Sequence, residues 1–162
     1  MKEIDFSLKA KMYNLVSELN QDEQELMKEA TTARNNAYAP YSKFKVGAAL
    51  LLDNGKIITG NNQENAAYPS GMCAERVAIW SAGAKYPKAK ILTMALTASS
   101  KNQITDQPIP PCGACRQAIA EYEIKQKQPI EIYFMGEKGK VVKSDSLENL
   151  LPLIFDHSFL EK

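Results

Sequence analysis

The sequence predicts an α/β fold, a three-layer α/β/α sandwich built around a mixed sheet of five strands. Two β-rich segments, residues 44–52 and 56–61, flank Asp53-Asn54-Gly55 and are typical of a hairpin. Two short apolar runs, residues 91–98 and 130–135, each follow a helical pattern and have the continuous hydrophobic character of strands that are buried on both faces. A sheet with helices on both of its faces accounts for these observations.

Helical patterns occupy the segments before and between these strands. Apolar residues recur at helical spacing after Asp22, whose carboxylate suits a helix N-terminus, and the pattern ends before Pro40. Similar patterns follow Cys73 and Pro111. The expected elements are, in chain order, a helix over about 22–37, strands over 44–52 and 56–61, a helix from 73 to about 84, a strand over 91–98, a helix from 111 to about 122, strands over 130–135 and 140–143, and a last helix that opens over 146–151.

Residues 1–20 are interpreted as an N-terminal arm of a single domain that spans residues 1–162. Residues 4–8 alternate like a strand, whereas the apolar residues between 12 and 19 step like a helix, and the choice between the two stays open. The stretch 99–111 carries three prolines, and its length indicates a functional loop rather than a domain boundary.

Composition and charge indicate an ordinary soluble domain that acts on a small molecule. Of the 162 residues, 44% are hydrophobic and 24% are charged, so the chain can bury a core without disulfide bonds. The 20 Lys and Arg residues nearly balance the 19 Asp and Glu residues, so no global field attracts nucleic acid or an anionic membrane. Apolar runs such as residues 46–52 are far shorter than the roughly 20 residues of a membrane span. We therefore expect neither nucleic acid nor a membrane as a partner.

The three cysteines lie at the predicted starts of two helices. Cys73 opens one helix, and Cys112 and Cys115 lie on one face of the first turn of another. Three thiolates that meet at one point suit zinc, because a catalytic zinc site takes three protein ligands and leaves a fourth position open. The site is open provided that the single histidine, His157, is not the fourth ligand. An odd number of cysteines, with no apolar signal core after Met1, also predicts a reduced, cytoplasmic protein.

Glu75 and Arg76 follow Cys73 closely and suit roles at such a site. Three thiolates on a divalent ion leave a net negative charge, which weakens the acidification of bound water unless a positive charge offsets it. The two helix N-termini supply part of that charge, and Arg76 can donate hydrogen bonds to a cysteine sulfur. Glu75 is close enough to the open position to move protons, so it is the candidate general acid and base.

Several blocks of the chain closely resemble the homotetrameric zinc-dependent cytidine deaminases. The matching blocks are residues 37–44 (AYAPYSKF), 46–49 (VGAA), 62–66 (NQENA), 68–69 (YP), 73–76 (CAER) and 111–117 (PCGACRQ). Three Cys or His ligands, a glutamate that is not a ligand, and a P-C-x-x-C element are also the general pattern of zinc deaminases. The resemblance implies a cytidine deaminase-like fold, one Zn²⁺ per subunit and a homotetramer. The implied reaction is hydrolysis of cytidine and 2'-deoxycytidine to uridine and 2'-deoxyuridine with release of ammonia, a step of pyrimidine salvage.

The resemblance also assigns roles to single residues. It implies that the zinc ligands are Cys73, Cys112 and Cys115 and that the proton shuttle is Glu75. For the substrate, it implies that Asn62 and Glu64 bind the ribose hydroxyls and that Phe44 stacks on the pyrimidine. The aromatic residue that reaches into a neighbouring subunit's site is then Phe155. The chain departs from the family pattern at Lys45, where proline is common, and at Trp80, where smaller or polar residues are common. Neither position carries one of these roles.

Other interpretations of the cysteines stay open. Cys112 and Cys115 also suit a thioredoxin-like redox pair, although this leaves Cys73 and Glu75 without a role. An aminonucleoside deaminase of the blasticidin type shares the zinc core. A non-catalytic three-cysteine module could close its site with His157 or with a residue of a partner and would hold zinc without releasing ammonia.

Taken one at a time, the remaining candidate residues suit structural roles. Phe44 and Phe155 would be core residues, Asn62 and Glu64 would be turn residues, and Arg76 would be a surface cation. Their functional roles are favoured by the resemblance.

Overall fold

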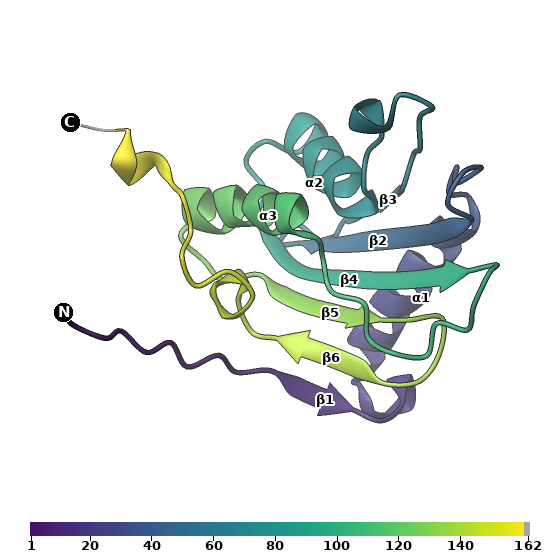
Figure 1. Ribbon diagram of the computed structural model, residues 1–162, viewed down its shortest axis with the longest axis horizontal. Helices are drawn as coiled ribbons and strands as arrows, with labels where there is room; N and C mark the ends of the chain where they lie inside the picture. Colours follow the sequence, from purple (N-terminus) through teal and green to yellow (C-terminus); the bar gives the residue numbers. More distant parts are fainter. Residues whose placement is uncertain (161–162) are drawn as a thin grey trace.

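The structure is a computed structural model that describes residues 1–160, and in this part of the chain strands and helices form one mixed sheet with three α-helices around it (Figure 1). The strands are β1 (Lys11–Tyr13), β2 (Phe44–Leu52), β3 (Ile57–Asn61), β4 (Ile91–Ser100), β5 (Glu131–Met135) and β6 (Val141–Ser144), the α-helices are α1 (Gln21–Asn35), α2 (Ala74–Lys85) and α3 (Gly113–Gln126), and the 3-10 helices are η1 (Val16–Glu18), η2 (Tyr68–Ser70), η3 (Leu147–Asn149) and η4 (His157–Phe159). The sheet order is β1-β6-β5-β4-β2-β3. β4 and β5 pair in parallel, and the other neighbouring strands are antiparallel.

The expected α/β class and mixed sheet are present, and most expected elements differ from the observed ones only at their ends. The sheet has six strands instead of the expected five, because β1 pairs with β6 at one edge. β1 comes from the N-terminal arm, where neither the expected strand nor the expected helix forms. Residues 4–8 form no strand, and the helical pattern between 12 and 19 gives only the η1 turn.

The prediction of a last helix over residues 146–151 is wrong, because only the single turn η3 forms there. Ser146 caps this turn, and its hydroxyl oxygen accepts a hydrogen bond from the Glu148 backbone N–H at 3.1 Å. The turn does not continue, since Pro152 disfavours helical backbone at Leu151 and has no N–H to donate.

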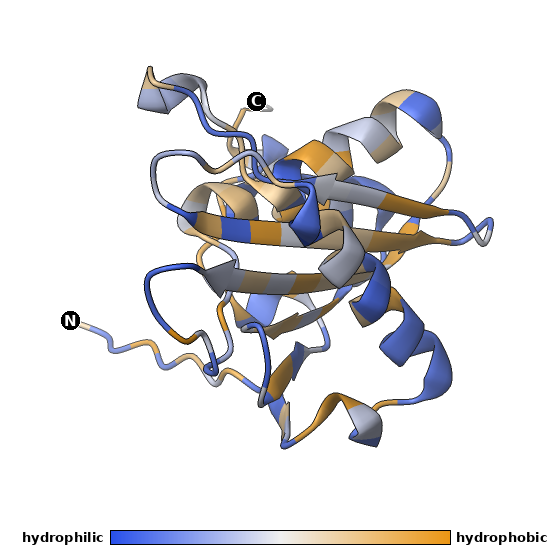
Figure 2. Cartoon of the chain, turned by 90° about the vertical axis from the view of Figure 1, so that its right-hand side faces the viewer, coloured by the Kyte–Doolittle hydropathy of each residue, from blue (hydrophilic) through white to orange (hydrophobic). Residues whose placement is uncertain are grey.

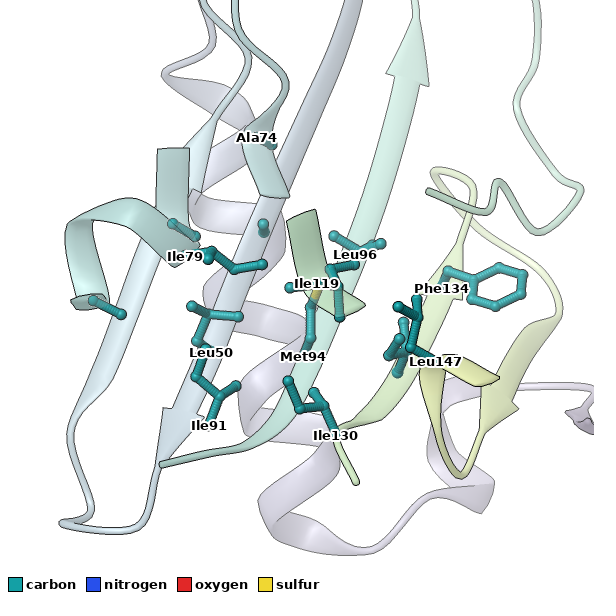
Figure 3. Close-up of a cluster of buried hydrophobic side chains, with 14 of the residues drawn as sticks. Leu50, Ala74, Ile79, Ile91, Met94, Leu96, Ile119, Ile130, Phe134 and Leu147 are labelled. Carbon is teal, nitrogen blue, oxygen red and sulfur yellow. The ribbon is translucent and has the colours of Figure 1, made fainter. Parts of the chain in front are cut away.

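Side chains alternate between the two faces of the sheet, and helices cover both faces. Ala49 and Ala95 share one hydrophobic cluster with α1 residues. Leu50, Met94 and Leu96 belong to the opposite cluster with residues of α2 and α3 (Figure 3). Figure 2 shows hydrophobic residues concentrated in the strands and hydrophilic residues in the connecting loops. Within residues 1–160, no helix has the length and apolar character needed to cross a membrane.

Two glycines allow helix backbone to lie directly on the sheet. A Cβ at Gly47 on β2 would overlap the Ala30 carbonyl oxygen of α1 and lie 2.5 Å from the Arg34 backbone nitrogen. On the other face, a Cβ at Gly60 on β3 would lie 2.5 Å from the Ala74 carbonyl oxygen at the start of α2. The contact at Gly60 fixes the N-terminal end of α2 against β3.

Gly47→Ala is expected to destabilise the fold strongly, because the new methyl group meets helix backbone that cannot rotate away. We expect a loss of about 3 kcal/mol or more in the free energy of unfolding, measured by denaturant titration. Gly113→Ala is the matched control, since a Cβ there meets nothing within 4 Å. Equal stability of the two variants would contradict the close packing of α1 on β2.

Candidate active site

Two helix N-termini bring the three cysteines together. Cys73 is the N-cap residue of α2, Cys112 is the N-cap residue of α3, and Cys115 lies in the first turn of α3. Neither cap thiol bonds to a backbone N–H of its helix. The three Sγ atoms lie within 4.8 Å of one another, and those of Cys73 and Cys112 are 4.0 Å apart.

This cluster fits a tetrahedral metal centre with an open position. Zinc–thiolate bonds of about 2.3 Å at tetrahedral angles separate two sulfurs by about 3.8 Å. The distance of 4.0 Å between Cys73 and Cys112 is close to that value. In residues 1–160, the three cysteines are the metal-ligating side chains that converge in this way, and His157 lies outside the group. The chain therefore offers three ligands instead of four.

The protonation of the cysteines also fits a cation. A hydrogen bond from Cys115, together with the nearby guanidinium of Arg76, lowers the pKa of Cys73 to about 5 against the opposing effect of burial. The same hydrogen bond to Cys73, followed by burial, raises the pKa of Cys115. The two opposite shifts favour a thiolate at Cys73 that accepts a hydrogen bond from the thiol proton of Cys115. A divalent cation bound by the sulfurs would displace that proton, and soft thiolate donors suit zinc.

Glu75 and Arg76 both lie beside the cysteine cluster. The Glu75 side chain is buried, with 5% of the residue exposed, and this burial raises the pKa of its carboxyl group. Arg76 Nη2 donates to the Sγ atom of Cys73 at 3.5 Å. The site therefore contains two complementary groups. The buried carboxyl group of Glu75 can take up and release a proton, and the guanidinium of Arg76 stabilises a thiolate.

A cavity of about 760 Å³ opens at the cysteine cluster. Its volume lies within the roughly 300–1,000 Å³ typical of small-molecule sites. The residues expected from the sequence that line it are Phe44, Asn62, Glu64, Cys73, Glu75, Arg76 and Cys112. They come from the start of β2, the segment after β3 and the starts of α2 and α3. The fold thus gathers groups that are far apart in the sequence around one space.

Asn62 and Glu64 are already held in place by hydrogen bonds. Asn62 Oδ1 accepts from the Val46 backbone N–H at 2.7 Å, and its Nδ2 donates to the Phe44 carbonyl oxygen at 2.9 Å. The Glu64 carboxylate accepts from two backbone N–H groups at 2.9 and 3.2 Å and from the hydroxyl of Ser42. Both polar side chains therefore have fixed orientations at the wall of the cavity.

Phe155 is not among the residues that line this cavity. It is 59% exposed and stacks on Phe159, with ring centroids 5.7 Å apart. Its carbonyl oxygen accepts a hydrogen bond of 2.8 Å from Gln117 Nε2. The side chain amide on α3 thus holds the C-terminal segment, while the Phe155 ring lies at the surface.

Sequence reasoning did not identify several residues that line the cavity. Among them are Tyr41, Ser42, Tyr68, Ile109 and Pro110. Tyr41, Ser42 and Tyr68 belong to the blocks that carry the family resemblance, which was the available signal. Ile109 and Pro110 belong to the proline-containing loop, whose length indicated function without indicating which residues carry it.

Ser42→Ala is expected to raise the pKa of Glu64 toward its ordinary value. The Ser42 hydroxyl is the main cause of the lowered pKa of this carboxyl group. A lowered pKa stabilises the folded protein above the pKa of the unfolded chain, and this contribution disappears as pH falls through the folded pKa. Any stability difference between wild type and variant should therefore shrink on acidification. Carbon NMR titration of the glutamate carboxyl groups measures the shift, with Ser42→Thr as the control that keeps a hydroxyl. An unchanged pKa in Ser42→Ala would disprove this role.

Comparison with known proteins identifies relatives across most of the chain. The family described as the cytidine and deoxycytidylate deaminase zinc-binding region matches residues 20–128. A cytidine deaminase of Halalkalibacterium halodurans is 48% identical over 100 residues, which cover 62% of this chain and 71% of that protein. A cytidine deaminase of Sporosarcina psychrophila is 41% identical over 137 residues, which cover 83% of this chain and 91% of that protein.

A solved structure supports the same relationship. The crystal structure of cytidine deaminase from Burkholderia pseudomallei superposes with a TM-score of 0.71 at 39% sequence identity, and the match covers 85% of this chain and 100% of that chain. This similarity confirms the expected cytidine deaminase-like fold. Together with the three converging thiols, the matched family identifies the metal as zinc. The chain belongs to the cytidine and deoxycytidylate deaminase zinc-binding family.

Proposed function

We propose that this enzyme hydrolyses cytidine and 2'-deoxycytidine to uridine and 2'-deoxyuridine, with release of ammonia. The observation that carries the proposal is the buried carboxyl group of Glu75 beside three converging thiols, in a cavity of about 760 Å³. A hydrolytic deaminase needs a group that moves protons next to the point where water becomes a nucleophile. The relatives described above are named cytidine deaminases, which favours a cytosine nucleoside as the substrate.

The chemistry divides between the metal and the side chains of the chain. Zinc held by Cys73, Cys112 and Cys115 supplies a Lewis acid that lets water act as a nucleophile near neutral pH. Glu75 takes one proton from the water that adds to C4 of the pyrimidine and delivers it to N3, and it then moves the remaining proton of the new C4 hydroxyl to the amino group. The C4–N bond then breaks, so that cytidine and water give uridine and ammonia. The guanidinium of Arg76, which donates to Cys73, offsets part of the negative charge of the thiolates.

The opposite wall of the cavity suits the rest of a nucleoside. The ring of Phe44 offers a flat apolar surface for stacking on the pyrimidine. Asn62 and Glu64 provide amide and carboxylate groups for the ribose hydroxyls, in orientations set by their bonds to the backbone. We assign them to the 3'-hydroxyl, so both cytidine and 2'-deoxycytidine are expected as substrates.

A blasticidin-type deaminase is the second candidate, since it shares the zinc core. Arg76 and the Glu64-Asn65-Ala66 segment favour the nucleoside enzyme. The relatives named as cytidine deaminases favour it as well. A non-catalytic zinc module is disfavoured, because a structural site closes with four ligands and His157 lies outside the cysteine cluster.

We also propose a homotetramer of single-domain subunits, each a three-layer α/β/α sandwich with residues 1–20 as an arm. Phe155, exposed at the surface, would complete the cavity of a neighbouring subunit. We propose the cytoplasm as the location, because the site needs its three thiols unpaired and a reducing compartment keeps them so. Cell fractionation would test the location, and recovery outside the cytoplasm would refute it.

Glu75→Gln is expected to lower uridine formation from cytidine by at least about 10²- to 10⁴-fold while the variant keeps its zinc, because the amide cannot exchange the proton. Product formation is followed by chromatography, and zinc content by a chelator assay. Glu121→Gln is the matched control, since Glu121 is exposed on α3 and should leave the rate unchanged. Cys112→Ser should lose both zinc and activity.

Zinc-loaded wild type that makes no uridine would refute the nucleoside assignment, and blasticidin S would be the next substrate. Wild-type rates in zinc-loaded Glu75→Gln would refute the role of Glu75.

Phe155→Ala is expected to impair catalysis in a way that a neighbouring subunit can restore. If Phe155 completes a neighbour's site, co-expression of Phe155→Ala and Glu75→Gln chains should give mixed tetramers in which some sites have both wild-type residues. Activity should then exceed the sum of the two separate variants, and light scattering should give the mass of four chains. Leu153→Ala, at another exposed apolar residue of the same segment, is the control. No recovery in mixed assemblies, or a monomeric mass, would contradict the proposal.

A further inference from the structure

Trp80 lies one helical turn after Arg76 on α2 and contacts its side chain. The guanidinium carbon of Arg76 is 5.9 Å from the Trp80 ring centroid, within the distance of a cation–π interaction. Residues spaced by four positions share one face of a helix, so the pair is set by the helix itself. Trp80 is the only tryptophan of the chain and is 45% exposed. The core packing of α2 therefore does not account for a ring of this size.

Arg76 is weakly held by its hydrogen bonds. Its side-chain hydrogen bonds go to sulfur, from Nη2 to the Cys73 Sγ atom at 3.5 Å and, with a smaller effect, to Cys115. Its Nε atom is buried without a hydrogen-bond partner in the described part of the chain. No carboxylate forms an ion pair with Arg76 in residues 1–160. A long hydrogen bond to sulfur and an unpartnered Nε restrict the guanidinium only weakly, and the Trp80 ring adds a further contact.

We propose that Trp80 is a positioning residue that holds the guanidinium of Arg76 against the Cys73 sulfur. The indole ring, with its centroid 5.9 Å from the guanidinium carbon, would limit the access of water on that side. Excluding water strengthens the attraction between guanidinium and thiolate, because the local dielectric constant falls. The inference rests on the proposed role of Cys73 as a zinc ligand. Its consequence is that Trp80, which is not among the residues that line the cavity, supports zinc retention and the reactivity of the site through Arg76.

Two variants of Trp80 separate the aromatic face from apolar bulk. Trp80→Phe keeps a ring, whereas Trp80→Leu keeps a bulky apolar side chain without a ring. We expect Trp80→Leu to lose zinc to a competing chelator about two- to five-fold more readily than wild type, and Trp80→Phe to lie near wild type. In cobalt-substituted protein, the thiolate-to-metal absorption band should shift in Trp80→Leu and not in Trp80→Phe. If Trp80 served only to pack against its neighbours, the two substitutions would change zinc loss and the cobalt absorption band to the same extent.

The decisive test repeats Trp80→Leu in an Arg76→Gln background. If Trp80 acts through Arg76, the second substitution adds no further loss of zinc retention. A loss of equal size in both backgrounds, or a loss in Trp80→Phe as large as in Trp80→Leu, would overturn the proposal. Zinc retention and the cobalt spectrum need no turnover, so failure of cytidine deamination leaves this test unaffected.

Wild-type fluorescence provides a second measurement that needs no change at Trp80. Since Trp80 is the only tryptophan, its emission should respond to removal and return of zinc in wild type and stay constant in Arg76→Gln. The proposal would also be overturned if zinc did not change the emission of wild type, or if it changed the emission of Arg76→Gln by the same amount. Thermal unfolding of each variant confirms that the folded protein is compared.

Discussion

Negative charge gathers at the cysteine cluster, and the fold must stabilise it there. Three sulfurs within 4.8 Å of one another lie beside the buried carboxyl group of Glu75. Without a cation, protons remain on the cluster, as the raised pKa values of Glu75 and Cys115 show. Two helix N-termini, the guanidinium of Arg76 and a divalent metal are the positive charges that allow thiolates to persist. Metal binding and the protonation state of the site are therefore one linked equilibrium.

The position of the helix starts depends in turn on close packing against the sheet. Gly60 lets the first turn of α2 lie on β3, where any side chain would collide with the Ala74 carbonyl. Asn62, two positions later, bonds through its amide to the backbone on both sides of Lys45, at Phe44 and Val46. The same short segment thus seats the helix that carries Cys73 and fixes the start of β2 that carries Phe44. The cysteine cluster and the cavity wall that carries Phe44 therefore depend on the same segment for their positions.

Local chemistry explains which features the sequence could predict. The β2–β3 hairpin was predictable because Gly55 adopts the positive φ of 75° that its turn requires. The cysteine cluster was predictable because each motif opens a helix, and helix N-termini orient their first-turn side chains. The pairing of β1 with β6 was not predictable, because it joins segments about 130 residues apart and adds a sixth strand to the sheet. The last helix failed because Pro152 stops it after one turn. Tyr41 and Ile109 reach the cavity from a turn and a loop, and Tyr68 reaches it from the short 3-10 helix η2, and no periodic pattern encodes such positions.

The residues directly after Cys115 connect the metal site to the C-terminal segment. Arg116 Nε donates to the Pro111 carbonyl oxygen at 2.9 Å, and its Nη1 donates to the Leu150 carbonyl oxygen at 2.8 Å. Gln117 donates to the carbonyl oxygen of Phe155. One turn of α3 therefore holds both the loop that leads into Cys112 and the segment that presents Phe155. Because these bonds are made to backbone carbonyls, they fix the path of the C-terminal segment whatever side chains it carries. If Phe155 completes a neighbour's cavity, the same helix turn that carries Cys115 also sets the geometry of the adjacent site.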